Sequence, residues 1–247
     1  MTSAPRNLHI GTSGWHFDHW RGPFYPPGWP PRDLLDFYAG RFRAVEINNS
    51  FYRLPTVETL QSWHDKVPED FLFAVKASRY ITHMKKLKDP ADCLPPFLDR
   101  IRTLGAKLGP ILFQLPPRWR CDTERLRAFL GQFPAPFRCA FEFRDESWQR
   151  DEVYRILEED GAACCLFDLE GRPGPQAETA DFVYLRLHGP GSAYRGSYGG
   201  EALASWATRI RGWLREGKEV FCFFDNDEGG FAALNAWSLQ ELLAETA

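Results

Sequence analysis

Short apolar runs rich in Val, Ile, Leu and Phe recur along the whole chain, and this recurrence restricts the fold more than any other feature. Most segments between the runs place apolar residues three or four positions apart, which is the spacing of an amphipathic helix. Strands that alternate with helices pair in parallel through right-handed crossovers. The sequence therefore predicts an α/β protein with a parallel sheet. Eight runs are strand-like: residues 8–14, 44–52, 71–78, 109–116, 138–144, 162–168, 182–189 and 219–227.

The number of strand–helix units indicates how the sheet is arranged. Eight units follow one another, and no stretch between them has the composition of a domain linker. This favours one parallel (β/α)8 TIM-type barrel that forms a single domain over residues 1–247. A chain of 247 residues also has the usual length of such a barrel. An open doubly wound sheet is the alternative. Residues 169–181 are short and rich in Pro and Gly, which predicts an irregular barrel that lacks the helix between strands six and seven. Helices are expected at 31–42, 56–67, 96–108, 122–133, 151–161, 201–217 and 231–246.

Polar residues inside the strands follow one parity. Successive side chains of a strand point to opposite faces, so Tyr184, Arg186 and His188 share one face of their strand. Glu142 and Arg144 share a face in the same way. Further polar residues alternate with apolar ones in the same way or lie near the end of a predicted strand: Glu46, Asn48, Lys76, Gln114, Asp168, Asp225 and Asp227.

This parity predicts that the polar set points into the barrel. Positions that face the outer helices must be apolar, and polar residues at the C-terminal ends of barrel strands usually belong to the active site. A bare charge there costs several kcal/mol of desolvation, so we expect these groups to be paired or solvated in a pocket. The alternative is a salt-bridged network that only closes the core.

Charge and cysteine usage limit the classes of partner and compartment. The chain has 30 basic and 33 acidic residues, so no overall charge draws it to nucleic acid or to an anionic membrane. No apolar run is long enough to span a bilayer, and the N-terminal residues have no signal core, which favours a cytoplasmic protein. Apolar strand-like runs contain Cys139, Cys164, Cys165 and Cys222, which predicts buried free thiols.

Several motifs, in order, resemble the YecE-like family, which is domain-of-unknown-function family seventy-two. They are GTSGW (11–15), VEINNSFYRLP (45–55), KASRYITH (76–83), FQLPP (113–117), FEFRDESW (141–148), YLRLHG (184–189) and FDNDEGGFAALNA (224–236). The resemblance implies a TIM-barrel-like fold and no particular activity. The family often has two adjacent Asn where this chain has Asp225-Asn226, and Tyr where it has Phe17. Matching positions are Trp15, Glu46, Asn48, Phe51, Tyr52, Lys76, His83, Gln114, Glu142, Arg144, Arg186, His188 and Asn226.

The expected pocket combines groups for acid–base chemistry with groups for anion binding. Glu46 together with Glu142, Asp168 or Asp225 would supply the two carboxylates of glycoside hydrolysis. His188 could exchange a proton near neutral pH. Three cations, Lys76, Arg144 and Arg186, suit a phosphate or carboxylate.

Residues around the strand ends add binding features that also have structural explanations. Gly229 and Gly230 precede a helix, where free N–H groups attract anions, or they only permit a turn. Trp15, Phe51 and Tyr52 could stack on a sugar ring or a nucleobase, or belong to the core. The glycine-rich residues 189–200 could form a mobile lid or a plain connection.

These patterns predict a metal-independent enzyme of hydrolase type that acts on a small anionic or sugar-phosphate-like ligand. No HExxH motif or cysteine cluster is present, and the interior cations disfavour a divalent metal at Glu46, Glu142, Asp225 and Asp227. The alternatives are nucleic acid binding, with Lys85, Lys86 and Lys88 on phosphates, and non-catalytic ligand binding. The predicted catalytic residues are Glu46, Lys76, Glu142, Asp168 and His188. The predicted substrate-binding residues are Trp15, Asn48, Phe51, Tyr52, His83, Gln114, Arg144, Arg186, Asp225, Asn226, Gly229 and Gly230.

Overall fold

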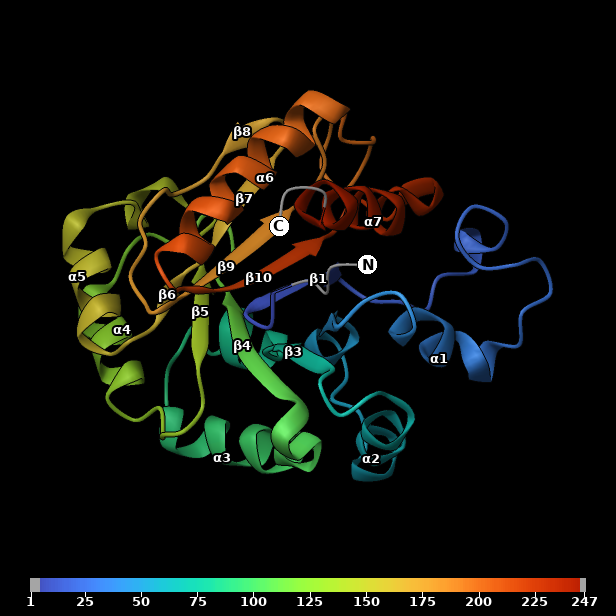
Figure 1. Cartoon of the computed structure of the whole chain (residues 1–247). Coiled ribbons are helices and arrows are strands. Elements are labelled where there is room, and N and C mark those ends of the chain that lie inside the picture. Colours follow the sequence, from blue (N-terminus) through green and yellow to red (C-terminus); the bar gives the residue numbers. More distant parts are fainter. Residues whose placement is uncertain (1–4, 245–247) are drawn as a thin grey trace.

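The computed structural model describes residues 5–244 as an α/β protein in which strands in the middle are surrounded by helices (Figure 1). Each predicted strand contains at least one observed strand. The strands are β1 (Leu8–Thr12), β2 (Ala44–Ile47), β3 (Leu72–Lys76), β4 (Leu108–Gln114), β5 (Cys139–Glu142), β6 (Ala163–Cys164), β7 (Leu166–Leu169), β8 (Arg172–Pro173), β9 (Phe182–Leu187) and β10 (Glu219–Phe224).

The seven predicted helices are also found. They are α1 (Leu34–Ala39), α2 (Val57–Lys66), α3 (Pro90–Ile101), α4 (Thr123–Leu130), α5 (Asp151–Glu159), α6 (Gly200–Arg215) and α7 (Phe231–Ala244). Helix α3 begins earlier than expected, with Pro90 in its first turn, where the missing N–H of proline is not needed. Between β7 and β9 the chain forms only the short β8 and no helix, as its Pro and Gly content predicts.

The strands form two sheets of five, in the orders β1-β10-β9-β7-β8 and β2-β3-β4-β5-β6. All pairs are parallel except β7 with β8, so the prediction of a parallel α/β fold is confirmed. A single closed (β/α)8 barrel is not confirmed. The sixth predicted strand is split at Cys165 into β6 and β7, which belong to different sheets.

Strand parity sorts the apolar side chains into two layers. Val45, Phe73 and Cys222 belong to the large core that the helices cover. Ala44, Ala74 and further small or aromatic side chains from both sheets form a second cluster between the sheets. The small alanines leave space there, and the polar residues at the strand ends continue the phase of this inner layer.

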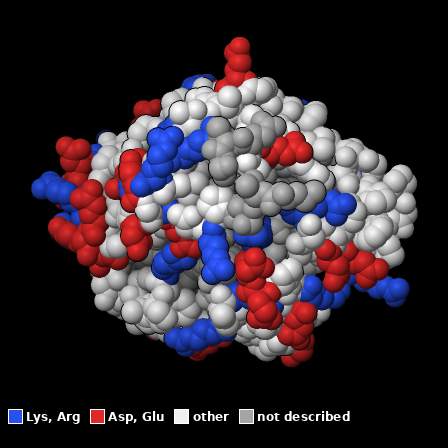
Figure 2. All heavy atoms as spheres, viewed as in Figure 1, with Lys and Arg blue, Asp and Glu red and all other residues white. Residues whose placement is uncertain are grey.

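The prediction of buried free thiols is confirmed, because all six cysteines are free and five of them are buried. Figure 2 shows Lys and Arg interspersed with Asp and Glu over the face in view. No helix within residues 5–244 is both long enough and apolar enough to cross a bilayer.

Strands β1 and β2 approach each other most closely at Gly11. A methyl group added there would lie 2.0 Å from the carbonyl oxygen of Ala44 and 2.8 Å from the hydroxyl of Tyr38. We expect Gly11→Ala to lower the free energy of unfolding by about 1–3 kcal/mol, because the strands must separate to admit the methyl. Denaturant unfolding measures this change. Gly212→Ala is the matched control, since nothing lies within 4 Å of its added methyl, and equal effects of the two substitutions would contradict the prediction.

Candidate active site

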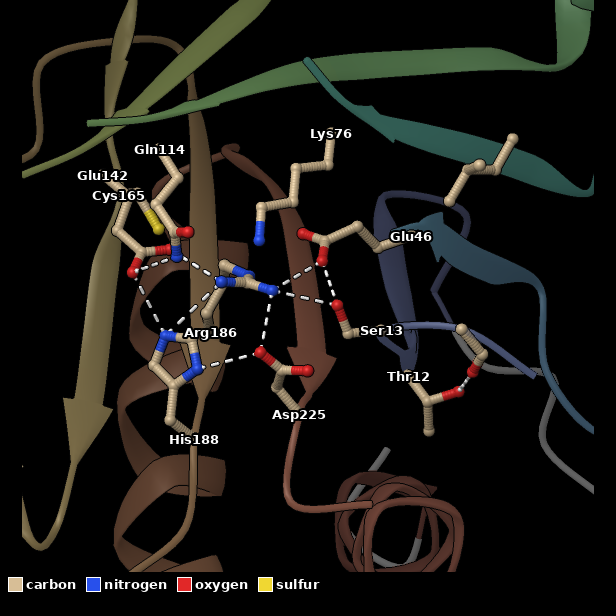
Figure 3. Close-up of polar contacts among 12 residues, drawn as sticks. Thr12, Ser13, Glu46, Lys76, Gln114, Glu142, Cys165, Arg186, His188 and Asp225 are labelled. Atoms are coloured by element: carbon tan, nitrogen blue, oxygen red, sulfur yellow. Dashed lines mark hydrogen bonds and ion pairs between the residues drawn. The ribbon is translucent and has the colours of Figure 1, made fainter. Parts of the chain in front are cut away.

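Arg186 on β9 is fully buried and binds three carboxylates from both sheets (Figure 3). Its Nη1 donates to Glu142 Oε2 at 2.8 Å, and its Nη2 donates to Glu46 Oε1 at 2.7 Å and to Asp225 Oδ2 at 2.9 Å. A buried charge needs such partners, because taking an ion out of water costs several kcal/mol. We call Glu46, Lys76, Glu142, Arg186, His188 and Asp225 the Arg186 cluster.

His188 links two members of this cluster through its ring nitrogens. Its Nδ1 lies 3.0 Å from Asp225 Oδ2, and its Nε2 lies 3.0 Å from Arg144 Nη2. Nε2 also lies 3.3 Å from Glu142 Oε1, so the ring contacts two carboxylates of the cluster. Arg144 also forms an ion pair with Glu142, so that Glu142 has two guanidinium partners.

Two carboxylates of the cluster, Glu142 and Asp225, are held in their ionised form. Burial opposes ionisation of Glu142, but Arg144, Arg186 and His188 outweigh it and hold the pKa of Glu142 well below its usual range. For Asp225, burial is likewise outweighed by Arg186 and by the hydrogen bond to His188, so its pKa is lowered. These groups are thus suited to accept protons or to orient neighbours, and poorly suited to donate a proton.

Lys76 is the exception in the cluster. Its side chain leaves the end of β3 and points toward Arg186 and Glu46 (Figure 3). The residue is only 7% exposed, yet its Nζ makes no hydrogen bond or ion pair with any residue in 5–244. The ring of Phe51 lies 4.6 Å from Nζ. Burial and then Arg186 lower the pKa of Lys76, against the opposite effect of the nearby carboxylates.

A pocket of about 620 Å³ borders the cluster at Ser13. Ser13 Oγ donates to Glu46 and accepts from Arg186 Nη2 at 2.9 Å, so one residue belongs to both the pocket wall and the polar network. The lining includes the cations Arg32 and Lys66 and contains no Asp or Glu. It consists of Ser13, Gly14, Trp15, His16, Phe17, Pro31, Arg32, Leu35, Asn48, Asn49, Tyr52, Ser62, Trp63 and Lys66.

Most of the predicted site residues converge. Gln114 donates to Glu142 at 3.0 Å, and the ring of His83 packs against that of Phe51 at 4.9 Å. Trp15, Asn48 and Tyr52 line the pocket, where Tyr52 is 75% exposed.

The structure does not bring Asp168 into the cluster. Asp168 has the parity of Leu166, which packs under the helices, and among residues 5–244 it forms no ion pair with a member of the cluster. Its Oδ1 is buried without a hydrogen bond. Its position near a strand end was therefore a poor guide to membership of the site. Burial raises the pKa of Asp168.

Three other predicted binding residues have structural roles outside the cluster. Asn226 donates to the carbonyl of Gly196 at 2.8 Å and to Asn235 Oδ1 at 2.9 Å, which ties down the loop after β9. Gly229 and Gly230 have positive φ angles of 60° and 80°, and a side chain at Gly230 would meet Pro23. These two glycines permit a tight turn before α7.

Three residues of the site were missed by sequence reasoning. Ser13 lies in the predicted run 8–14 and bridges to Glu46, so strand parity was an available signal for it. Tyr194 comes from the loop after β9, where strand parity assigns nothing. Tyr194 places its ring 5.5 Å from that of His188 and its hydroxyl 3.4 Å from Arg144 Nη2. Tyr184 donates to Glu46 Oε2 at 2.7 Å, and its parity with Arg186 was the available signal.

Among residues 5–244, no three His, Cys, Asp or Glu side chains are grouped so that they could hold a metal ion. The carboxylates of the cluster are instead directed at guanidinium groups.

Comparison with known proteins identifies relatives over nearly the full chain. The family described as "Protein of unknown function DUF72" matches residues 9–247. The UPF0759 protein YunF of Bacillus subtilis is 27% identical over 96% of this chain and 94% of its own length. The UPF0759 protein YecE of Escherichia coli K12 is 32% identical over 44% of this chain and 41% of its own length.

Solved structures show the same fold. The crystal structure of a DUF72 family protein from Thermotoga maritima is 30% identical, with a TM-score of 0.87 over 96% of this chain and 98% of that chain. A DUF72 family protein from Enterococcus faecalis, at 21% identity, has a TM-score of 0.81 over 96% of this chain and 95% of that chain.

Proposed function

This chain belongs to the DUF72 family, and we propose that it is a metal-independent enzyme of hydrolase type that acts on a small anionic or sugar-phosphate-like ligand. One observation carries the proposal. A pocket lined by Arg32 and Lys66, without any acidic residue, shares Ser13 with a buried cluster of acids and bases. Each cation has an acid beside it, Asp33 at 3.7 Å from Arg32 and Asp36 at 3.9 Å from Lys66, but neither acid lines the pocket. A lining that contributes cations and no carboxylate favours an anionic ligand.

In this proposal the anionic group of the ligand lies beside Arg32 and Lys66, and the bond to be broken lies beside Ser13. Glu46 is the carboxylate next to the pocket, so it is the group assigned to take a proton from the attacking water. Arg186 already donates to Ser13 and Glu46, and its guanidinium would stabilise negative charge that develops there.

A thermal-shift screen with phosphorylated sugars and nucleotides tests the binding step. A ligand at about 100 times its Kd contributes about 2.7 kcal/mol, which raises the Tm of a chain of this size by about 5–10 °C. We expect Arg32→Gln/Lys66→Gln to abolish this shift, because the substitutions remove both pocket cations. We also expect Glu46→Gln, which removes the assigned base, and Glu142→Gln, which removes a carboxylate that holds Arg186, to reduce release of phosphate or sugar.

The matched control is Lys86→Gln/Lys88→Gln, in a second cavity of about 770 Å³ lined by Lys85, Lys86, Lys88, Arg120 and Trp119, among others. That cavity favours nucleic acid binding as the second candidate function. Under that alternative the control variant loses binding, and binding weakens steeply with added salt. If no ligand stabilises the wild-type chain and Glu142→Gln changes no activity, the hydrolase proposal fails.

The proposal extends to the architecture, in which the two sheets represent the halves of one (β/α)8 barrel. An isolated parallel bridge between Ser13 and Glu46, and a hydrogen bond from Gly14 N to Glu46 O of 2.9 Å, support contact between β1 and β2. On the other side, Cys165 lies in the chain between β6 and β7, and its N donates to Phe141 O of β5 at 2.9 Å. Free thiols at all six cysteines favour the cytoplasm as its compartment.

A further inference from the structure

Two buried lysines, Lys76 and Lys107, differ in the hydrogen-bond partners of their Nζ atoms. Lys107 is 1% exposed, and its Nζ donates to the carbonyl oxygens of His64 and Val67 at 2.9 Å each and lies 3.4 Å from Glu69. Lys76 is 7% exposed and has no such partner within residues 5–244. Among residues 5–244, Lys76 Nζ is not one of the fully buried side-chain atoms that lack a hydrogen bond, so the atom itself stays in contact with solvent. It is therefore free to meet a ligand, whereas the Nζ of Lys107 is occupied by its partners.

The charges around Lys76 point to a role for a cation at this position. The cluster contains three carboxylates and, with Arg144, two guanidinium groups, which leaves one negative charge for Lys76 to balance. Burial and Arg186 nevertheless lower the pKa of Lys76, which increases the share of Nζ that is uncharged. An uncharged lysine amine in a desolvated site is a nucleophile.

We propose that Lys76 forms an imine with the aldehyde or ketone group of a small ligand that enters the cluster. This inference goes beyond hydrolysis and gives the site a covalent step. It needs only that a carbonyl group reaches Nζ, so it does not depend on turnover by the proposed hydrolase.

The step balances without an oxidant or reductant. Lys76 Nζ first gives a proton to a carboxylate of the cluster, and its lone pair then forms a bond to the carbonyl carbon. The carbonyl oxygen takes back the proton that the carboxylate holds, receives a second proton that the nitrogen of the carbinolamine gives up, and leaves as water. The nitrogen keeps one proton as an iminium ion. Because the iminium carries the same positive charge as the ammonium, the three carboxylates stabilise both.

Reductive trapping tests the inference directly. The full chain is incubated with glyoxylate, pyruvate or glyceraldehyde 3-phosphate and sodium cyanoborohydride, which reduces an iminium to a stable secondary amine, and the modified lysines are located by peptide mass mapping. We expect Lys76 to be modified about tenfold or more faster than Lys107, because Lys107 is also buried but its Nζ is hydrogen-bonded to two carbonyl oxygens.

Two variants decide between a specific and a random reaction. Lys76→Arg keeps the positive charge, cannot form an imine and should lose the fast adduct, whereas Lys107→Arg should keep it. Modification that is spread over exposed lysines such as Lys86 and Lys88, and is unchanged in Lys76→Arg, would overturn the inference. If Lys76→Arg does not fold, the wild-type map alone decides by whether Lys76 carries the adduct. Trapping is scored by mass, so a failure of hydrolysis and a failure of imine formation are distinguishable.

Discussion

Arg186→Met is expected to lower the free energy of unfolding by about 3–5 kcal/mol, because it leaves Glu46, Glu142 and Asp225 buried without their shared cation. Methionine fills a similar volume, so the loss reports the charges more than a cavity. The change is measured by denaturant unfolding at neutral pH. Arg144 and Lys76 remain nearby, but Glu46 and Asp225 have no other guanidinium partner among the described residues.

Two further variants separate the burial of charge from the general effect of removing an arginine. Arg102 forms an exposed pair with Asp99, and such pairs contribute at most about 1 kcal/mol, so Arg102→Met should be nearly neutral. Adding Glu46→Gln to Arg186→Met should recover stability, because it removes one of the charges that are left without a guanidinium partner. A double variant that is less stable than Arg186→Met would contradict this account.

Acid should destabilise the protein steeply through the same cluster. The folded-state pKa values of Glu142 and Asp225 are lowered, so below about pH 4.5 the unfolded chain binds protons that the folded chain does not. The stability that these carboxylates contribute is complete above their unfolded pKa values and is lost as the pH falls toward their folded ones. Each group then costs about 1.4 kcal/mol per pH unit.

Glu142→Gln tests directly whether the free energy of unfolding falls with pH because of this carboxylate. Glutamine cannot ionise, so the variant should be less stable than the wild type at pH 7, and the difference should shrink by about 1.4 kcal/mol per pH unit below about pH 4.5. Denaturant unfolding from pH 7 down to pH 3 measures both chains. Glu159→Gln, in an exposed pair with Arg127, is the control and should run parallel to the wild type. A constant difference between Glu142→Gln and the wild type at all pH values would refute the prediction.

Strand parity was enough to predict the centre of the site. Glu46, Glu142 and Arg186 lie inside regular strands, where alternation fixes the face of each side chain. Their apolar neighbours on the other face had to meet the helices, so the polar residues could only converge. The same rule locates Lys76 and Asp225 at the ends of β3 and β10.

The parts that could not be predicted lie where alternation gives no information. Tyr194 belongs to a loop, and Arg32 and Lys66 come from helical segments in which an exposed cation looks like any solvated surface residue. Asp168 was assigned from its place in the chain alone, and the break at Cys165 gives no signal in an apolar run. The extent of hydrogen bonding between the two sheets depends on the local spacing of their edge strands, for example at Gly11. Amino-acid composition does not reveal this spacing.

The loop after β9 is fastened at its base and rests on the cluster only at its tip. Asn226 and Asn235 hold Gly196 and Tyr198. Tyr194 donates from its backbone N to His188 O at 2.6 Å, and its ring and hydroxyl lie against His188 and Arg144. A solute that approaches His188 from this side must displace one tyrosine ring while the base of the loop stays in place. The frequency of that small displacement sets an upper limit on how often the imidazole can exchange protons with a solute from this side, however fast the chemistry beneath it is.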